Sequence, residues 1–138
     1  MDTNSHCSTL RDATPSPWRF CNGGVTAPQG FQAAGITAGL KASGRADLAL
    51  LLAPQDAVCA GAFTTSFVRA ACVDLCAERL ESTAGRTRAV LINSGQANAC
   101  TGDRGLVDSL RATASLADLL GEQDERILIC STGVIGVP

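Results

Sequence analysis

Apolar runs separated by short polar turns predict most of the secondary structure of this 138-residue chain. A continuous apolar run of strand length, bounded by turn residues, predicts a buried β-strand. Five segments fit that description, namely residues 46–53, 57–63, 70–75, 88–93 and 127–130. Residues 54–56 between the first two strands are typical of a hairpin loop. From Cys21 to Gly44 small residues and repeated glycines predict turns and short strands that pack closely.

Helical periodicity predicts a short helix over residues 77–83 and a longer one over residues 103–120. The longer helix is expected to bury one face, formed by Leu106, Leu110, Ala114, Ala117 and Leu120. Thr101 or Asp103 can cap its start, and Gly121 ends it. Strand, loop, helix and strand over residues 88–130 form an α/β unit whose two strands can lie parallel.

The predicted fold class is therefore α/β, with a mixed sheet and flanking helices. Strands 46–53, 88–93 and 127–130 are apolar on both faces, as in sheets that are covered on both sides.

Two polar segments follow buried strands and carry candidate chemistry. Residues 93–102 are small or amide-bearing, and Asn93 and Asn98 flank Gly95, so a tight, irregular turn is expected. After strand 127–130 comes Ser131-Thr132-Gly133, also predicted to be a turn. Thr132 can offer an O–H and Gly133 an N–H without a Cβ in the way, which are the donors of an oxyanion hole. The alternative is an ordinary turn, in which Ser and Thr bond their own backbone and Gly supplies a positive φ.

Composition narrows the function classes. The length is that of one domain, and with 46% hydrophobic but only 4% aromatic residues the core must be aliphatic. A net charge of −2 without a basic stripe argues against a nucleic-acid partner. No apolar run approaches the roughly 18 residues of a membrane span. Seven irregularly spaced cysteines and one histidine predict neither a metal site nor a disulfide framework. Reduced thiols in a cytoplasm are expected instead.

The chain divides into two parts. Residues 1–18 are polar and lack the apolar core of a secretory signal peptide, so they are expected to be a disordered leader. Residues 19–138 are expected to form the domain. Within it, the glycines from Gly39 to Gly44 are followed by Arg45 and Ala46, so the lysine and hydroxyl of a phosphate-binding loop are missing.

Several motifs in order give the chain a family resemblance. They are VTAPQGF at residues 25–31, AAGI at 33–36, DLAL at 47–50, AGAFTT at 60–65, NSG at 93–95, NACTG at 98–102 and STGVIG at 131–136. The chain resembles the N-terminal, alpha-chain portion of the bifunctional ornithine acetyltransferase / N-acetylglutamate synthase family of arginine biosynthesis. Ser66 and Gln96 depart from the pattern, because the family often has Asn at both positions.

The resemblance implies a multifunctional acyltransferase of the cytoplasm that uses no cofactor. It would move an acetyl group from N-acetylornithine to glutamate, with acetyl-CoA as the other donor that the resemblance allows. The precursor would cut itself at an Ala-Thr bond, and the freed Thr of the beta chain would be the nucleophile. Thr132 and Gly133 map onto the family's oxyanion hole. The beta chain would complete a layered α/β sandwich within a heterotetramer of two alpha and two beta chains.

The same resemblance places the nucleophile, the general base and most substrate contacts beyond Pro138. Ala13-Thr14 and Ala112-Thr113 are the Ala-Thr pairs of this sequence, and neither has the family context. We therefore expect part of a first subunit, or a truncated product, that is inactive alone. Two alternatives stay open: a non-catalytic fragment, and part of a related self-processing hydrolase with an N-terminal nucleophile.

Overall fold

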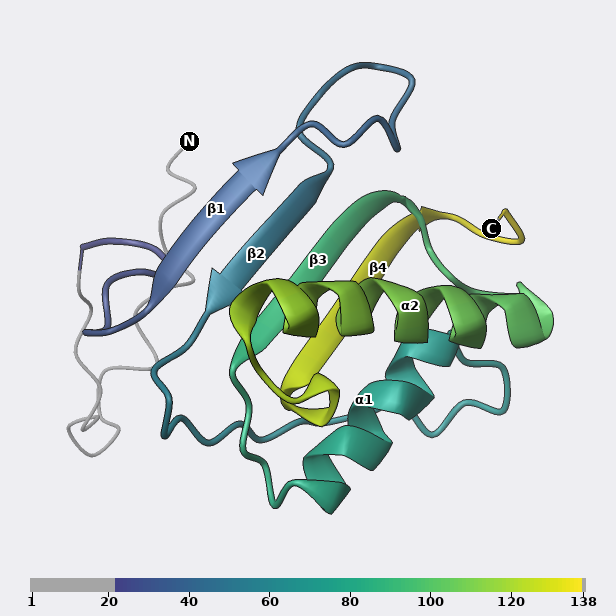
Figure 1. Cartoon of the computed structure of the whole chain (residues 1–138). Helices are drawn as coiled ribbons and strands as arrows, with labels where there is room; N and C mark the ends of the chain where they lie inside the picture. The colour runs from purple at the N-terminus through teal and green to yellow at the C-terminus, as the bar shows by residue number, and fades with distance from the viewer. Residues whose placement is uncertain (1–21, 138) are drawn as a thin grey trace, which may run out of the picture.

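A computed structural model describes residues 22–137, so the predicted leader at residues 1–18 lies outside the described part. One four-stranded sheet carries two helices (Figure 1). The elements in chain order are β1 (Gln32–Ile36), β2 (Leu48–Leu52), α1 (Ala71–Ser82), β3 (Ala89–Gln96), α2 (Gly102–Leu120), the short 3₁₀ helix η1 (Asp124–Arg126) and β4 (Ile127–Val134).

The sheet is mixed, with the strand order β1-β2-β3-β4. β2 pairs antiparallel with β1 and β3, whereas β3 and β4 run parallel and are connected through α2. The α/β fold class and the parallel unit around the longer helix are thus confirmed.

Both helices lie against one face of the sheet (Figure 1). Cys72, Leu75 and Cys76 of α1 pack with Leu128 and Ile129 of β4 in one buried cluster. A second cluster joins Ala89, Ala117 and Ile127. None of the helices in the described part of the chain is long and apolar enough to cross a membrane.

Helix α2 begins and ends close to its predicted bounds, but it buries a different face. Gly105, Ser109, Thr113 and Ala117 are buried at a spacing of four residues. Leu106 and Leu110, predicted to be on the buried face, are 42% and 38% exposed. Small side chains bring a helix closer to its neighbours, and this close approach takes precedence over the leucine periodicity.

Two predicted strands are wrong. Residues 70–75 lie at the start of α1, whose buried residues Cys72, Leu75, Cys76 and Arg79 follow a helical spacing. Residues 57–63 form no strand; Val58 makes only an isolated bridge to Arg86. The predicted hairpin is therefore absent there, because β2 finds its partners in β1 and β3.

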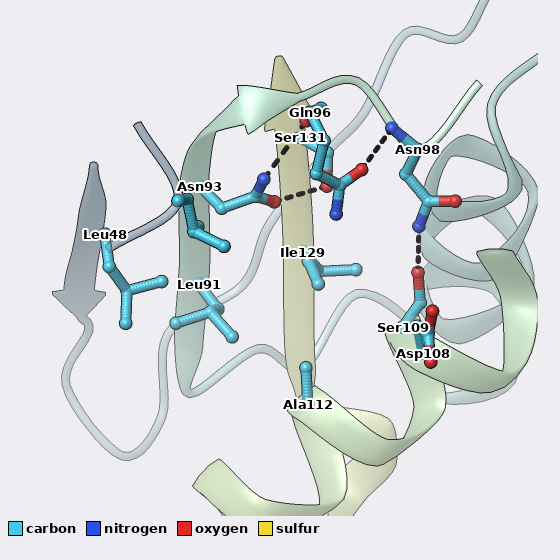
Figure 2. A pocket seen from close by; sticks show the side chains of 11 residues that line it. Leu48, Leu91, Asn93, Gln96, Asn98, Asp108, Ser109, Ala112, Ile129 and Ser131 are labelled. Carbon is cyan, nitrogen blue, oxygen red and sulfur yellow. Dashed lines mark hydrogen bonds between the residues drawn. The ribbon is translucent and has the colours of Figure 1, made fainter. Parts of the chain in front are cut away.

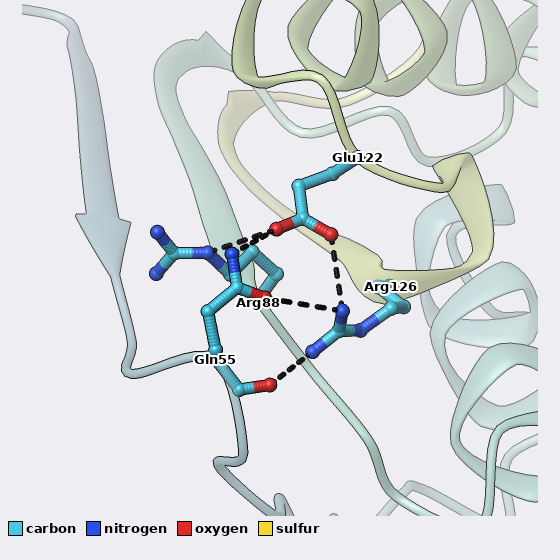
Figure 3. Close-up of polar contacts among 4 residues, drawn as sticks. All are labelled: Gln55, Arg88, Glu122 and Arg126. Atoms are coloured by element: carbon cyan, nitrogen blue, oxygen red, sulfur yellow. Dashed lines mark hydrogen bonds and ion pairs between the residues drawn. The ribbon is translucent and has the colours of Figure 1, made fainter.

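A cluster of charged side chains holds together the start of the two parallel strands (Figure 3). Glu122, which follows α2, lies 3.1 Å from Arg88 Nε and 3.0 Å from Arg126 Nη1. Gln55 donates to the same carboxylate at 2.7 Å, and Arg126 donates to the Gln55 carbonyl. Arg88 and Arg126 immediately precede β3 and β4, so one carboxylate fixes where both strands begin.

Side chains of α1 cover part of the outer edge of β4. Arg79 Nη1 donates to the Ile127 carbonyl at 2.6 Å. The Cys76 thiol accepts from Ile129 N at 3.3 Å and donates to Ile129 O at 3.2 Å. Burial raises the pKa of the Cys76 thiol, which keeps the proton that it donates. The edge is therefore closed to another strand as far as Ile129.

The loop between β1 and β2 is folded around a buried carboxylate. Asp47 Oδ1 accepts from Ala38 N at 2.6 Å, and Oδ2 accepts from Lys41 N at 2.8 Å. These hydrogen bonds, with a smaller contribution from the Lys41 charge, hold the pKa of Asp47 below its ordinary value. The loop in turn presses Leu40 against β3, since a Cβ at Gly95 would lie 2.9 Å from the Leu40 carbonyl.

The sheet face opposite the helices is open only in part. Leu128, which lies on this face, is buried in a cluster that Cys59 also contacts, whereas the face is exposed along β1 and toward the carboxyl ends of β3 and β4. Residues that pair across it include Gly35, Ala49, Ile92 and Cys130, which belong to four neighbouring strands. Ile92 and Cys130 are exposed, and β1 is exposed along its whole length. The expected cover on both faces is thus only partial within residues 22–137.

We predict that the chain self-associates when it is expressed alone, because part of this apolar face lacks a cover. Ile92→Lys places a charge on the open face and should raise the concentration at which dimers form by about tenfold, the equivalent of 1.4 kcal/mol. Leu119→Lys, on the exposed side of α2, is the matched control and should change little. Sedimentation velocity over a concentration series measures both. A sharp, monomeric, cooperative unfolding transition of the unchanged chain would contradict the prediction.

We also predict that Asp47 makes the stability of the chain depend on pH in acid. Its folded pKa is lowered, so its stabilising effect is complete above about pH 4 and is lost as the pH falls through the lowered pKa. Asp47→Asn should therefore lower the urea midpoint at pH 7, and the difference should shrink towards pH 2. Asp56→Asn removes an exposed carboxyl and serves as the control. The prediction is refuted if the difference between the urea midpoints of wild type and Asp47→Asn stays constant down to pH 2.

Candidate functional site

The Ser131-Thr132-Gly133 motif lies inside β4 and is not the predicted turn. β4 continues to Val134, and Thr132 and Gly133 pair with Ser94 and Gly95 of β3. The structure therefore joins the two polar segments of the sequence side by side at the carboxyl ends of the two parallel strands. This is the end of a parallel sheet at which ligands usually bind.

Gly95 and Gly133 face one another in an unusually close approach. Their φ angles are 145° and 137°, in a region that favours glycine. A Cβ on Gly133 would come within 2.6 Å of Gln96 N and would collide with the Gly95 carbonyl. Sequence reasoning explained Gly133 by substrate access; the structure adds a second requirement, which is room for the neighbouring strand.

The backbone of Gly133 is directed to the outer edge of the sheet. N–H and C=O groups of successive strand residues point alternately to the two sides. Ile127 and Ile129 direct theirs toward α1, whereas the Val134 carbonyl accepts from Ala97 N, on the β3 side, at 2.8 Å. Gly133 belongs to the outward series, so its N–H points away from β3 into the exposed part of the edge beyond Ile129.

Side chains along β4 alternate as well, so Ser131 and Thr132 serve different faces. Ser131 points to the helix side, where it lines a pocket of about 260 Å³ together with Asn93, Asn98 and Ser109 (Figure 2). Thr132 lies on the open face beside Ser94, with its side chain exposed. The Thr132 hydroxyl and the Gly133 N–H are thus both accessible and one residue apart.

Amides, hydroxyls and the Asp108 carboxylate form the polar lining of this pocket, whose apolar lining includes Leu48, Leu91 and Ile129 (Figure 2). Ser131 Oγ donates to Asn93 Oδ1 at 2.5 Å, and Asn93 Nδ2 donates to the Gln96 carbonyl at 3.1 Å. The expected irregular turn begins only after Gln96, where β3 ends.

Asn98 is the centre of that turn. It has a φ of 52°, as expected for an Asn in the left-handed region, and it is 4% exposed. Its Nδ2 donates to Gly105 O at 3.0 Å and to Ser109 Oγ at 2.5 Å. Thr101 is the N-cap residue of α2, but its hydroxyl donates to Asn98 Oδ1 at 3.1 Å and caps no helix N–H.

The sequence did not identify these contacts. The sequence indicates the backbone preferences of Asn93 and Asn98 but not their side-chain partners, and the motifs include neither Gly105 nor Ser109. The signal available was the run of small residues every four positions in α2, which includes both. Gly105 is required because a Cβ there would collide with Thr101 Oγ1 and Asn98 Oδ1.

Titratable groups are few around the motif. Desolvation raises the pKa of the Cys130 thiol although part of its surface is exposed, and the neighbouring Cys72 and Cys59 thiols add to the shift. The sulfur beside Ser131 is therefore a neutral thiol near pH 7. In residues 22–137, no three His, Cys, Asp or Glu side chains are grouped so that they could hold a metal ion.

Comparisons with known proteins identify the family of the chain. The chain is 74% identical over 130 residues to the arginine biosynthesis bifunctional protein ArgJ of Parasynechococcus marenigrum, covering 94% of the chain and 32% of that protein. It is 70% identical over 129 residues to the protein of the same name from Prochlorococcus marinus strain MIT 9313, covering 94% and 30%. The chain thus spans about a third of the length of these curated relatives.

Two solved structures share the fold. Ornithine acetyltransferase from Mycobacterium tuberculosis, complexed with ornithine, is 47% identical with a TM-score of 0.75, covering 83% of this chain and 61% of that one. The arginine biosynthesis bifunctional protein ArgJ from Bacillus halodurans is 37% identical with a TM-score of 0.78, covering 83% and 59%. A sequence model of the ArgJ family matches residues 32–138. The chain therefore belongs to the ArgJ family.

Proposed function

We propose that this chain forms part of an acetyltransferase of arginine biosynthesis, in which Thr132 and Gly133 are the oxyanion hole. The enzyme transfers the acetyl group of N-acetylornithine to glutamate, and acetyl-CoA is a second acetyl donor. The observation that carries the proposal is the outward direction of the Gly133 N–H beside the exposed Thr132 hydroxyl, at the ligand-binding end of a parallel strand pair. Membership of the ArgJ family supports the reaction class.

The chemistry follows from where charge develops. Attack on the acetyl carbonyl turns its oxygen into an oxyanion, and two preset donors stabilise it as the bond forms. Each such donor typically contributes about 3–4 kcal/mol to lowering the barrier. A backbone N–H held in a sheet and a hydroxyl on a β-branched side chain both have few conformations to lose.

The groups that complete the reaction lie, in this proposal, on a beta chain. The precursor cuts itself at an Ala-Thr bond, and the freed Thr acts as the nucleophile in a heterotetramer of two alpha and two beta chains in the cytoplasm. Two observations support a second chain: the curated relatives are about three times as long, and part of the apolar sheet face is exposed. The beta chain would cover this face and complete a layered α/β sandwich.

We predict that Thr132→Ala lowers the rate of acyl-enzyme formation by about 10²–10³, with a much smaller change in KM for N-acetylornithine. The reason is that the bond to Thr132 matters most in the transition state. The measurement uses this chain joined to the part of the Parasynechococcus marenigrum relative that it does not cover, with burst kinetics and melting temperature taken on one sample. Thr132→Ser keeps the hydroxyl and should keep much of the activity.

An unchanged rate with a lowered melting temperature would instead make the Thr132 hydroxyl a structural hydrogen bond of about 1 kcal/mol. Gly133→Ala is expected to be more damaging than Thr132→Ala. It is a poor test of function, however, because the added Cβ also collides with Gly95.

We predict further that residues 1–138 alone transfer no acetyl group from N-acetylornithine to glutamate. Without a nucleophile, positioned donors have nothing to assist. Transfer is followed by chromatography of acetylglutamate, using chain purified from a host that lacks its own enzyme of this family. Turnover by the purified chain would overturn the division of roles between two chains.

A further inference from the structure

Thr132, Gly133 and Val134 are all exposed, so apolar packing does not hold this segment in place. Its alignment has to come from hydrogen bonds. Hydrogen bonds hold the chain immediately before and immediately after the Thr132–Gly133 segment. Before it, the Ser131 hydroxyl donates to Asn93 Oδ1 at 2.5 Å. After it, the Val134 carbonyl accepts from Ala97 N at 2.8 Å.

Before the segment, the buried side chain of Asn93 makes two hydrogen bonds. Asn93 is 7% exposed, and the same amide that accepts from Ser131 donates to Gln96 O at 3.1 Å. One side chain thereby fixes the position of β4 against the end of β3 (Figure 2). A buried amide without its partner is costly, so this arrangement has a single favoured geometry.

The hydrogen bonds after the segment depend on helix α2. Ala99 O accepts from Gly136 N at 2.8 Å, so residues 97–99 hold the chain at both Val134 and Gly136. Asn98 lies between these two bonds and is itself held by Gly105 O and Ser109 Oγ of α2. The end of β4 is therefore attached to the helix through one buried side chain.

We propose that Ser131, Asn93 and Asn98 are positioning residues for the Thr132–Gly133 oxyanion hole. None of them supplies a donor to the oxyanion; they fix the β4 backbone on either side of the two donors. This inference rests on the proposed function of Thr132 and Gly133. It adds that the face of the sheet turned toward α2 controls the reactivity of a site on the exposed edge.

The expected effect follows from how sharply oxyanion donors depend on distance. They act at about 2.7–3.1 Å from the oxyanion, and functional groups must be held within about 0.5 Å of that geometry. Loosening β4 by a fraction of that distance should lower kcat by about tenfold. KM should change little, because the misplaced donors act mainly on the transition state.

The test uses the joined enzyme described above, with acetyl transfer to glutamate as the assay. Ser131→Ala should lower kcat about tenfold per folded molecule, and Ser131→Thr should restore it, since it keeps the hydroxyl and the pocket has room for a methyl group. Thr113→Val is the matched control. Thr113 is a fully buried hydroxyl that bonds only the backbone of its own helix. It should lower the melting temperature without changing kcat.

A double variant separates the two proposals. If Ser131 acts through the oxyanion hole, Ser131→Ala should lower kcat less in the Thr132→Ala background than in the wild type. The factor by which it lowers kcat should be at least three times smaller. Two results would overturn the proposed function: a normal rate in Thr132→Ala, or the absence of transfer activity in the joined enzyme that carries no substitution. A slow Thr132→Ala with a normal Ser131→Ala would overturn the positioning role alone.

Amide hydrogen exchange in the chain itself gives a second, activity-free readout. The amides of Ala97 and Gly136 flank the site and are hydrogen-bonded to Val134 O and Ala99 O. Ser131→Ala and Asn98→Ala should each speed exchange at these two amides by about tenfold or more, whereas Thr113→Val should not. Unchanged exchange at both amides in both variants would overturn the proposal.

Discussion

The parallel pairing of β3 with β4 is the constraint on which the rest of the structure depends. At one end, Glu122 lies between Arg88 and Arg126 and fixes where both strands begin. At the other end, Gly133 comes so close to Gly95 that it could carry no side chain, and Gly95 could carry none because of the Leu40 backbone. Parallel strands need a long crossover, which is usually a helix packed on the sheet, and α2 provides this connection. The charged end tolerates little change, since removing one partner of a buried ion pair leaves an uncompensated charge.

Much of this arrangement could be predicted from the sequence, for reasons that differ between elements. The central strands β3 and β4 are apolar on both faces, and such runs are recognisable without any periodicity. Helix α2 was recognised by its length, yet its buried face was wrong because the pattern favoured leucines where the structure packs glycine, serine and threonine. The first half of α1 was predicted to be a strand. Residues 70–73 are continuously apolar, so this short stretch shows no helical periodicity; the helical spacing of Cys72, Leu75, Cys76 and Arg79 is visible only over the whole helix.

In the candidate site, too, features of a short stretch could be predicted from the sequence, whereas contacts between distant residues could not. Thr132 and Gly133 were found by residue type and by resemblance, which are properties of a short stretch. The geometry around them was not accessible in that way, because a Gly at a φ of 137° can continue a strand as well as end one. The partner of Asn98 is Ser109, 11 positions along the chain on another element. Which hydroxyl a buried amide meets is decided by how α2 packs, and no pattern within the 93–102 motif specifies that.

The partial cover on the edge of β4 sets a limit on how this sheet can grow. Cys76 and Arg79 occupy the backbone groups of Ile129 and Ile127, so a strand added from outside cannot run the full length of β4. It can pair only from Ser131 onward. At about 3.3 Å per residue, the four residues of β4 from Ser131 to Val134 offer an edge of roughly 13 Å. So short an exposed edge disfavours the pairing of long strands by which sheets assemble into fibrils. It still leaves room for a short extended segment to pair in one register.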